Sequence, residues 1–275
     1  MPELPEVETV ARTLEPLIQE RVITGVTLCN PGSLEGPEPL ETVIGRRIAG
    51  TGRRGKLVLI RFVPQDGSVV EGIAVHLRMT GRLFVYAAGE VPGPHTRAVF
   101  DLSDGNRLFF DDTRKFGCVR VISPQSLNIW PFWNALGPEP LEIGPAAFAA
   151  RFAGRRTAIK ALLLDQTVIA GIGNIYADES LFRAGIAPQS PASGLSAGRL
   201  KKLHAALVEV LEESIAACGS SIRDYRTARG DAGAFQNAFR VYGRGSSPCV
   251  SCGRMLEKGR VAGRTTVWCP HCQRR

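Results

Sequence analysis

The chain has 275 residues, 44% hydrophobic and 22% charged, which is a globular composition with enough length for two domains. No apolar run approaches the length of a membrane span, and the first residues lack the basic and apolar segments of a signal peptide, so we expect a cytoplasmic protein. The net charge is +8 and the pI about 9.4, and the distribution of this charge along the chain is more informative than the total.

The first three residues carry the most specific chemical signal. A small second residue normally allows removal of Met1, which would leave Pro2 as a secondary amine at the chain end. Terminal amines have a pKa of roughly 7.7–8.0, so a sizeable neutral fraction exists near pH 7. Attack by such an amine on an aldehyde carbon gives an iminium ion, which is a strong electron sink. Glu3 is adjacent and could supply the acid or the base.

Helical and extended patterns follow in order. Apolar residues recur at three- and four-residue steps from Val7 to Ile18, so a helix is expected to begin near Pro5. Residues 21–123 form short β-branched and apolar runs between Gly, Asp and Pro, which predicts a β-sandwich. After a Pro- and Gly-rich linker, helical periodicity returns in four segments, at 147–152, 159–165, 175–184 and 196–217.

Two glycine-containing stretches interrupt the helical part. Residues 166–176 join two predicted helices by consecutive tight turns, and Asn174 stands where it can cap the second helix, whose free N–H groups can bind an anion. Alone this signal is weak, because most Gly-x-Gly turns only connect elements. Residues 225–235 are polar and have the composition of a mobile loop.

Basic residues occur at three predicted turns of the β-rich part. Met79 alone would most simply be a core residue and His76 a structural histidine. Phe116 stands between cations and a glycine, in a turn that can insert a planar side chain into a base stack or can be an ordinary turn. The three turns are Arg53-Arg54-Gly55-Lys56, His76-Leu77-Arg78-Met79-Thr80-Gly81-Arg82 and Asp112-Thr113-Arg114-Lys115-Phe116-Gly117.

The last 38 residues concentrate positive charge. Residues 238–275 hold eight basic residues against Glu257, a net +7, which leaves +1 for the rest of the chain. A basic tail on a nearly neutral body favours a polyanionic partner, nucleic acid before membrane, although a solubilising tail would have the same charge.

Four of the seven cysteines form a metal-ligand pattern. Two Cys-x-x-Cys pairs separated by 16 residues match a four-thiolate zinc site, and we predict one structural zinc ion rather than two disulfides or a redox pair. The remaining Cys29, Cys118 and Cys218 have apolar or small neighbours and are interpreted as buried fillers. The predicted ligands are Cys249, Cys252, Cys269 and Cys272.

The patterns together predict an α+β protein of two domains. An N-terminal β-sandwich flanked by helices is expected at 1–130 and a linker at 131–148. A helical domain with a helix–two-turn–helix element is expected at 149–237, followed by a zinc-finger β-hairpin at 238–275.

These motifs, in this order, resemble the formamidopyrimidine-DNA glycosylases over essentially the whole chain. Besides the turns and cysteines above, the resemblance is carried by Pro-Glu-Leu-Pro-Glu-Val-Glu-Thr-Val from Pro2, Leu136-Gly137-Pro138-Glu139-Pro140-Leu141, Gly171-Ile172-Gly173-Asn174-Ile175-Tyr176 and Val241-Tyr242-Gly243-Arg244. It implies a DNA-repair enzyme that removes oxidised purines, chiefly 8-oxoguanine opposite cytosine and formamidopyrimidines, and then cuts the strand.

The resemblance also implies a mechanism. Pro2 would attack C1′ of the damaged nucleotide and form a Schiff base, with Glu3 as acid–base partner and Glu6 in support. Successive β- and δ-elimination would then remove the sugar. Damaged double-stranded DNA would be the partner, and a monomer is the family expectation.

Further roles follow for residues at matching positions. Phosphates would be bound by the active-site residues Lys56 and Arg264 and by His76, Asn174 and Tyr242, with His95 as a further DNA contact. The resemblance also assigns a wedge: Met79 and Arg114 would occupy the space of the extruded nucleotide, and Phe116 would wedge the opposite strand, with Lys115 as a neighbouring DNA contact. The flipped base would be covered by a segment containing Ser220, Ile222, Arg223, Asp224 and Tyr225.

Two alternatives stay open on the sequence. The first is an enzyme of the endonuclease VIII branch, which prefers oxidised pyrimidines. Some relatives carry a glutamate where this chain has Thr80, so the contacts to the oxidised base can differ. A zinc-finger DNA-binding protein without catalytic activity is the alternative from another class. Pro2, Glu3 and Lys56 together count against it, because phosphate binding needs neither a terminal proline nor an acidic neighbour.

Overall fold

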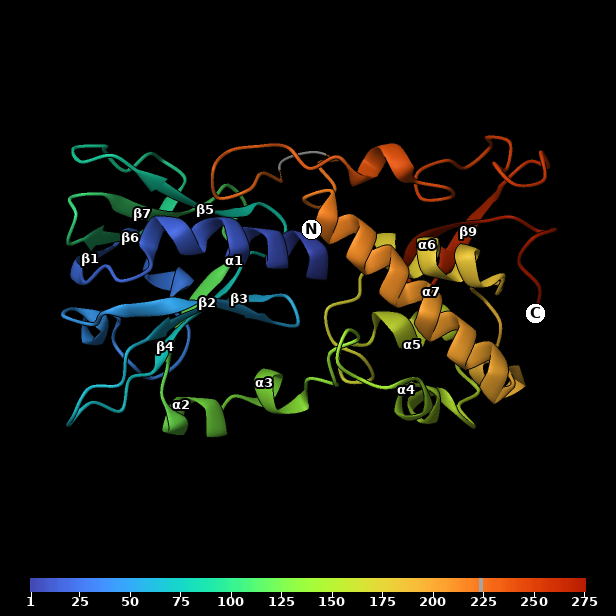
Figure 1. The fold of residues 1–275 in the computed structure, drawn as a ribbon, viewed down its shortest axis with the longest axis horizontal. Coiled ribbons are helices and arrows are strands. Elements are labelled where there is room, and N and C mark those ends of the chain that lie inside the picture. The colour runs from blue at the N-terminus through green and yellow to red at the C-terminus, as the bar shows by residue number, and fades with distance from the viewer. Residues whose placement is uncertain (223–224) are drawn as a thin grey trace. The chain divides into compact units, whose positions relative to one another are not determined.

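A computed structural model describes residues 1–222 and 225–275, which form two compact units (Figure 1). The first unit contains residues 1–134 and 218–233, and the second contains 135–217 and 234–275. Residues 218–233 belong to the first unit although they follow the longest helix of the second.

The first unit is a β-sandwich of two four-stranded antiparallel sheets. The strand orders are β1-β6-β7-β5 and β2-β3-β4-β8. The strands are β1 (Ile23–Leu28), β2 (Ile48–Arg54), β3 (Leu57–Phe62), β4 (Gly72–His76), β5 (Gly81–Tyr86), β6 (Thr96–Leu102), β7 (Arg107–Asp112) and β8 (Cys118–Ile122).

Helix α1 (Leu4–Ile18) closes this sandwich and fixes the N-terminus. Its residues Val7, Val10, Leu14 and Ile18 are buried with side chains from both sheets, as the helical spacing of the sequence predicts. Pro5 lies in the first helical turn, where its missing N–H costs no hydrogen bond. Two short helices, α2 (Pro124–Asn128) and α3 (Pro131–Ala135), follow the last strand.

The second unit contains helices and a hairpin. The helices are α4 (Pro145–Phe152), α5 (Ile159–Leu164), α6 (Asn174–Ala184) and α7 (Ala197–Ala216), and the hairpin is formed by β9 (Glu257–Val261) and β10 (Arg264–Trp268). Helix α6 packs against α7, α5 and β10. The predicted α+β class, with a sandwich, helices and a terminal hairpin, is therefore confirmed.

The interpretation of three cysteines as buried fillers is correct only for Cys118. Cys29 and Cys218 are exposed. Cys29 lies just beyond the end of β1, and Cys218 has a left-handed backbone (φ 58°) after α7, so both occupy chain ends of elements rather than their packed faces. Among the described residues, no helix combines the length and apolarity needed to cross a membrane.

Candidate active site and nucleic-acid-binding residues

The N-terminal proline and its two acidic neighbours are buried at the start of α1. Glu3 and Glu6 are only 4% and 2% exposed, and Pro2 is buried as well. The Glu3 backbone N–H donates to Glu6 Oε2 at 2.9 Å. The structure retains Met1, so the Pro2 nitrogen is an amide here and becomes an amine only after Met1 is removed.

A distant segment completes the surroundings of Glu6. The Ser220 backbone N–H and hydroxyl donate to Glu6 Oε1 at 2.8 and 2.9 Å, across 214 residues of sequence. The carboxylate is thus bonded on both oxygens, which fixes its orientation beside the N-terminus. This brings Ser220, predicted to lie near the flipped base, to the same place as Pro2 and Glu3.

The rest of that segment is described in part. The Tyr225 hydroxyl donates to the Cys218 carbonyl at 3.2 Å, and burial, followed by the charge of Glu6, raises its pKa. Ile222 is 47% exposed. Arg223 and Asp224 lie outside the described residues.

Lys56 and His76 are brought together by strand register. Lys56 lies in the turn between β2 and β3, and the next residue, Leu57, pairs with His76 at the end of β4. Both side chains are nearly buried, at 6% and 5% exposure. The sequence indicated a basic turn and a histidine, but only the register shows that they are neighbours.

The His76 ring has a defined tautomer. Its Nδ1 accepts the Arg78 backbone N–H at 3.1 Å, so in the neutral ring the proton sits on Nε2. Burial, together with the charges of Arg78 and Lys56, lowers the pKa of His76 to about 3. A neutral donor at Nε2 can bind a phosphate oxygen equally well throughout the physiological pH range.

This environment predicts an acid-sensitive contribution to stability. An unfolded histidine has a pKa near 6.5, so below that pH only the unfolded state gains a proton and stability falls towards pH 3. At pH 5 the loss should be about 2 kcal/mol. Urea unfolding at pH 7.5 and 5.0 should therefore show a larger loss for the native protein than for His76→Gln. Equal losses would contradict the assigned neutral state.

The residues predicted to form the wedge lie on two turns. Met79 and Phe116 are 41% and 55% exposed, so neither is the core residue that its apolar character alone would suggest. Arg114 Nη1 lies 2.9 Å from Met79 Sδ, and its guanidinium lies 4.8 Å from the Phe116 ring centre. Lys115 is also exposed, between Arg114 and Phe116.

His95 and Thr80 are both hydrogen-bonded to Asp112, which directly precedes the turn that carries Arg114 and Phe116. His95 is exposed, and its carbonyl accepts the Asp112 N–H at 2.8 Å. The Thr80 hydroxyl donates to the Asp112 carboxylate. The threonine that replaces a glutamate of some relatives is thus bonded to the turn that carries Arg114 and Phe116.

In the second unit, Asn174 and Tyr242 line one hollow of about 200 Å³ at the start of α6. Gly173, not Asn174, is the N-cap, which corrects the expectation that Asn174 caps the helix. Asn174 is the first helical residue, and its Nδ2 donates to the Thr265 carbonyl of β10 at 3.0 Å. Glycine suits the cap because its missing side chain leaves the helix N–H groups accessible.

Glu179 fixes the position of Tyr242 and was not found from the sequence. This residue is 3% exposed and accepts the backbone N–H groups of Arg240, Val241 and Tyr242 at 2.7 to 3.1 Å. A glutamate in the middle of a helix carries no local signal of such a role, because its partners lie about 60 residues away.

A buried ion pair joins α5 and α6 to β10. Lys160 and Asp178 lie 2.6 Å apart, with side chains 0% and 1% exposed. Lys160 Nζ also donates to the Thr266 hydroxyl at 2.7 Å and the Thr265 carbonyl at 3.3 Å. Burial raises the pKa of Asp178 to about 7, a rise that Lys160 limits. The pair holds the strand that begins with Arg264.

Breaking this pair should be costly. Lys160→Met leaves Asp178 without its cation and the Thr266 hydroxyl without its donor, so we expect a loss of about 3–5 kcal/mol in urea unfolding. The double variant Lys160→Met/Asp178→Leu removes both charges and should recover much of that loss. Additive losses in the double variant would contradict the pairing.

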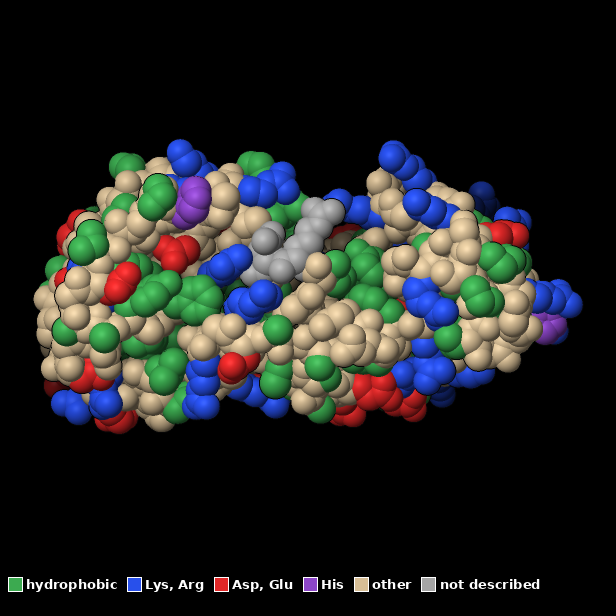
Figure 2. All heavy atoms as spheres, turned by 90° about the horizontal axis from the view of Figure 1, so that it is seen from above, with side chains coloured by type: hydrophobic (Ala, Val, Ile, Leu, Met, Phe, Trp, Pro, Cys, Tyr) green, Lys and Arg blue, Asp and Glu red, His purple; other side chains and the backbone are tan. Residues whose placement is uncertain are grey.

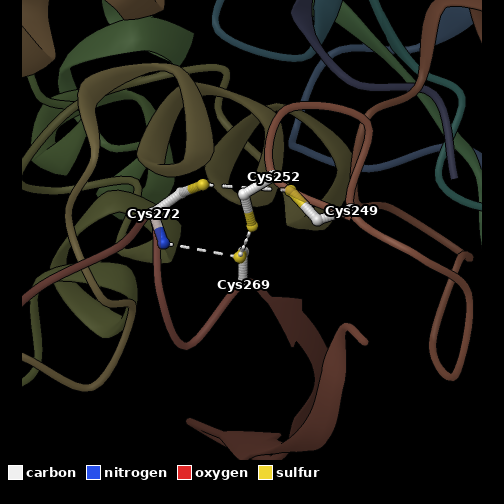
Figure 3. A group of neighbouring side chains, drawn as sticks. All are labelled: Cys249, Cys252, Cys269 and Cys272. Carbon is white, nitrogen blue, oxygen red and sulfur yellow. Dashed lines mark hydrogen bonds between the residues drawn. The ribbon is translucent and has the colours of Figure 1, made fainter. Parts of the chain in front are cut away.

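The four predicted cysteines converge in the hairpin region (Figure 3). Their sulfur atoms all lie within 4.8 Å of one another, with Cys249 to Cys272 at 3.9 Å and Cys252 to Cys269 at 3.5 Å. Tetrahedral Zn–S bonds of about 2.3 Å separate sulfurs by about 3.8 Å, so the cluster fits one zinc ion. The predicted structural zinc site is confirmed by this cluster and by the family comparison below.

Arg264 begins β10 directly after the hairpin turn. Ala262 and Gly263 both have left-handed backbones, with φ values of 50° and 72°, as in the tight turns that match strand twist. Arg264 is exposed beside this turn. Figure 2 shows further Lys and Arg side chains on the surfaces of both units, so the exposed positive charge is not confined to the tail.

Pro2 and its two acidic neighbours are buried together at the start of α1, an arrangement that simple DNA binding does not require. The class is a base-excision-repair DNA glycosylase with lyase activity. Three family models agree: the formamidopyrimidine-DNA glycosylase N-terminal domain at 1–119, its H2TH domain at 136–226, and the zinc finger found in FPG and IleRS at 246–275. The chain belongs to the formamidopyrimidine-DNA glycosylase family.

Relatives and solved structures match over the full length. The formamidopyrimidine-DNA glycosylase of Nitratidesulfovibrio vulgaris is 48% identical and that of Geobacillus kaustophilus 45%, each covering 100% of both chains. The structure of Lactococcus lactis Fpg with DNA containing an abasic site has a TM-score of 0.89 at 34% identity, covering 99% of this chain and 100% of the other. Thermus thermophilus MutM (Fpg) has a TM-score of 0.87 at 40% identity, covering 99% and 98%.

Proposed function

We propose that this enzyme excises oxidised purines, 8-oxoguanine and formamidopyrimidines, from duplex DNA through a Schiff base on Pro2. The observation that carries the proposal is the buried start of the chain's first helix, where the buried Pro2 precedes the buried Glu3 and the doubly bonded Glu6. A solved structure of the Lactococcus lactis enzyme contains Fapy-dG DNA, which supports the substrate class.

The reaction begins at C1′ of the flipped nucleotide. The free Pro2 nitrogen forms a bond to C1′, the glycosidic bond breaks, and the base leaves with a proton. Opening of the sugar ring at O4′ gives the iminium ion, and Glu3 exchanges the protons that this step requires. The buried position of Glu3 favours such transfers because it limits competition from bulk water.

Strand cleavage follows from the acidity next to the iminium. Loss of a C2′ proton expels the 3′ phosphate in β-elimination, and a second elimination expels the 5′ phosphate. In this proposal Lys56, the neutral His76 and Arg264 bind phosphates near the lesion, and Asn174 and Tyr242 bind another at the α6 hollow. Phosphate contacts carry no sequence information, which suits an enzyme that inspects all DNA.

Borohydride trapping tests the proposal. Duplexes with 8-oxoguanine opposite cytosine should give a covalent complex, and thymine-glycol duplexes should give less. No complex on either substrate would overturn the enzymatic proposal, and a preference for thymine glycol would assign the chain to oxidised pyrimidines. A structure of Lactococcus lactis Fpg contains an oxidized pyrimidine, so that comparison is informative.

We further propose that the enzyme acts as a monomer in the cytoplasm, on nucleoid DNA. The basic C-terminal segment supports the DNA association, and the family expectation supports the monomer. Light scattering after gel filtration should give a mass near 29.7 kDa. A mass of twice that value would contradict the monomer.

A further inference from the structure

The wedge residues extend from two turns that are distant in sequence. Residues 77–80 join β4 to β5, and residues 113–117 join β7 to β8. Met79 and Phe116 are too exposed to be held by core packing, so their positions depend on the turn backbones. Each turn contains a non-glycine residue in the left-handed region, Arg78 at φ 50° and Lys115 at φ 59°. Such backbone conformations persist only where surrounding bonds hold them.

One buried carboxylate bonds to both turns. Asp112 is 0% exposed. Its Oδ1 accepts the Thr80 hydroxyl and also the Arg114 N–H at 3.2 Å, and its Oδ2 accepts the Gly117 N–H at 2.7 Å. The Arg114 N–H also lies 3.1 Å from Thr80 Oγ1. The second turn, through the Arg114 and Gly117 N–H groups, and the first turn, through the Thr80 hydroxyl, therefore share one acceptor group.

Close backbone approach leaves this network little freedom. A Cβ at Gly117 would lie 2.8 Å from the Phe110 ring and 3.2 Å from Asp112 Oδ2. A Cβ at Gly81 would lie 2.4 Å from the Leu77 carbonyl oxygen. Gly81 also pairs with Asp112 in the register of β5 and β7. The two glycines let the turns close tightly around the carboxylate.

We propose that the Thr80–Asp112 pair is a positioning device that holds Met79, Arg114 and Phe116 as one preformed wedge. The inference rests on the proposed function, because it takes these three residues to enter the base stack. A wedge already ordered in the free enzyme loses less side-chain and backbone entropy on insertion than a loose one. The pair should therefore speed unstacking of the lesion without touching DNA itself.

Thr80→Val tests the pair because valine keeps the branched shape and removes the hydroxyl. Stopped-flow fluorescence of 2-aminopurine beside 8-oxoguanine reports unstacking, and single-turnover assays report excision. Removing a hydrogen bond to a buried carboxylate should slow both about 10-fold. Borohydride trapping on a preformed abasic site, where no base must be unstacked, should change less than about 2-fold. Thr80→Ser keeps the hydroxyl and should retain the native rates.

Thr42→Val is the matched control. Thr42 lies in the same unit, and its exposed side chain donates one hydrogen bond, to the Pro39 carbonyl at 2.6 Å. The Thr42→Val variant should leave the rates of unstacking and excision unchanged. Native unstacking by Thr80→Val would overturn the proposal, as would an equal slowing on 8-oxoguanine and abasic duplexes.

If the proposed function itself is wrong, the same experiments give a different set of results. In that case the native enzyme excises no 8-oxoguanine, or Met79→Ala and Phe116→Ala leave 2-aminopurine unstacking unchanged. If those two variants slow unstacking and Thr80→Val does not, only the Thr80–Asp112 pair is refuted.

Discussion

An enzyme with one additional residue between Met1 and Pro2 is expected to form no borohydride-trapped complex and to lose at least about 1,000-fold in lesion cleavage. The extension keeps the Pro2 nitrogen in an amide, which is not nucleophilic. The fold should survive, because Met1 is 51% exposed and an extension can leave the protein surface there. Single-turnover cleavage of an 8-oxoguanine duplex measures the loss.

The control separates chemistry from binding. The extended enzyme should bind a duplex containing a tetrahydrofuran abasic analogue within about 2-fold of the native affinity and keep its thermal unfolding temperature. Pro2→Gly, which leaves a primary amine, should retain some trapping but cleave poorly. Mass spectrometry must show that the extension is still present. Normal cleavage by an enzyme so verified would refute the amine mechanism.

Local sequence patterns were sufficient for much of the fold. The 3.6-residue spacing from Val7 to Ile18 and the short runs of 21–123 predicted α1 and the sandwich, because one side of each element must face the core. The cysteine spacing predicted the zinc centre for a similar reason, since each Cys-x-x-Cys turn presents two sulfurs to one ion.

Long-range pairing was the part that local patterns could not supply. Glu6 and Ser220 meet across 214 residues, Lys160 and Thr266 across 106, and Asp112 joins two turns through hydrogen bonds. The partners Ser220 and Asp112 lie near glycines, where a serine or an aspartate is common in any turn, so the local sequence does not identify these pairings. The resemblance indicated which residues matter, whereas the structure shows what holds them in place.

Zinc removal should have the second large effect. The hairpin has a small core, in which Phe182, Val241, Leu256 and Val267 pack with the cysteines. So few apolar side chains cannot offset the entropy of ordering the segment, whereas a structural zinc site contributes roughly 10–16 kcal/mol. Metal-free protein should therefore lose amide protection in β9 and β10, measured by hydrogen exchange, while β3 and β4 stay protected.

Zinc loss should also weaken DNA binding by at least about 100-fold at physiological salt, because the hairpin carries Arg264 and much of the basic segment. Cys269→Ser should reproduce the loss. Cys29→Ser, which changes an exposed cysteine outside the site, should not. Re-addition of zinc to the chelated native protein should restore binding. Native affinity in protein shown to be free of metal would contradict the structural role.

The salt dependence of this weakening identifies its origin. If the hairpin contacts phosphates only, affinity should fall by the same factor for intact and lesion-containing duplexes. The slope of log affinity against log salt should become shallower by about one unit for each phosphate that the protein no longer neutralises, and Arg264→Ala alone should account for about one unit. A loss confined to lesion duplexes, with an unchanged slope, would instead show that the hairpin acts on the flipped nucleotide.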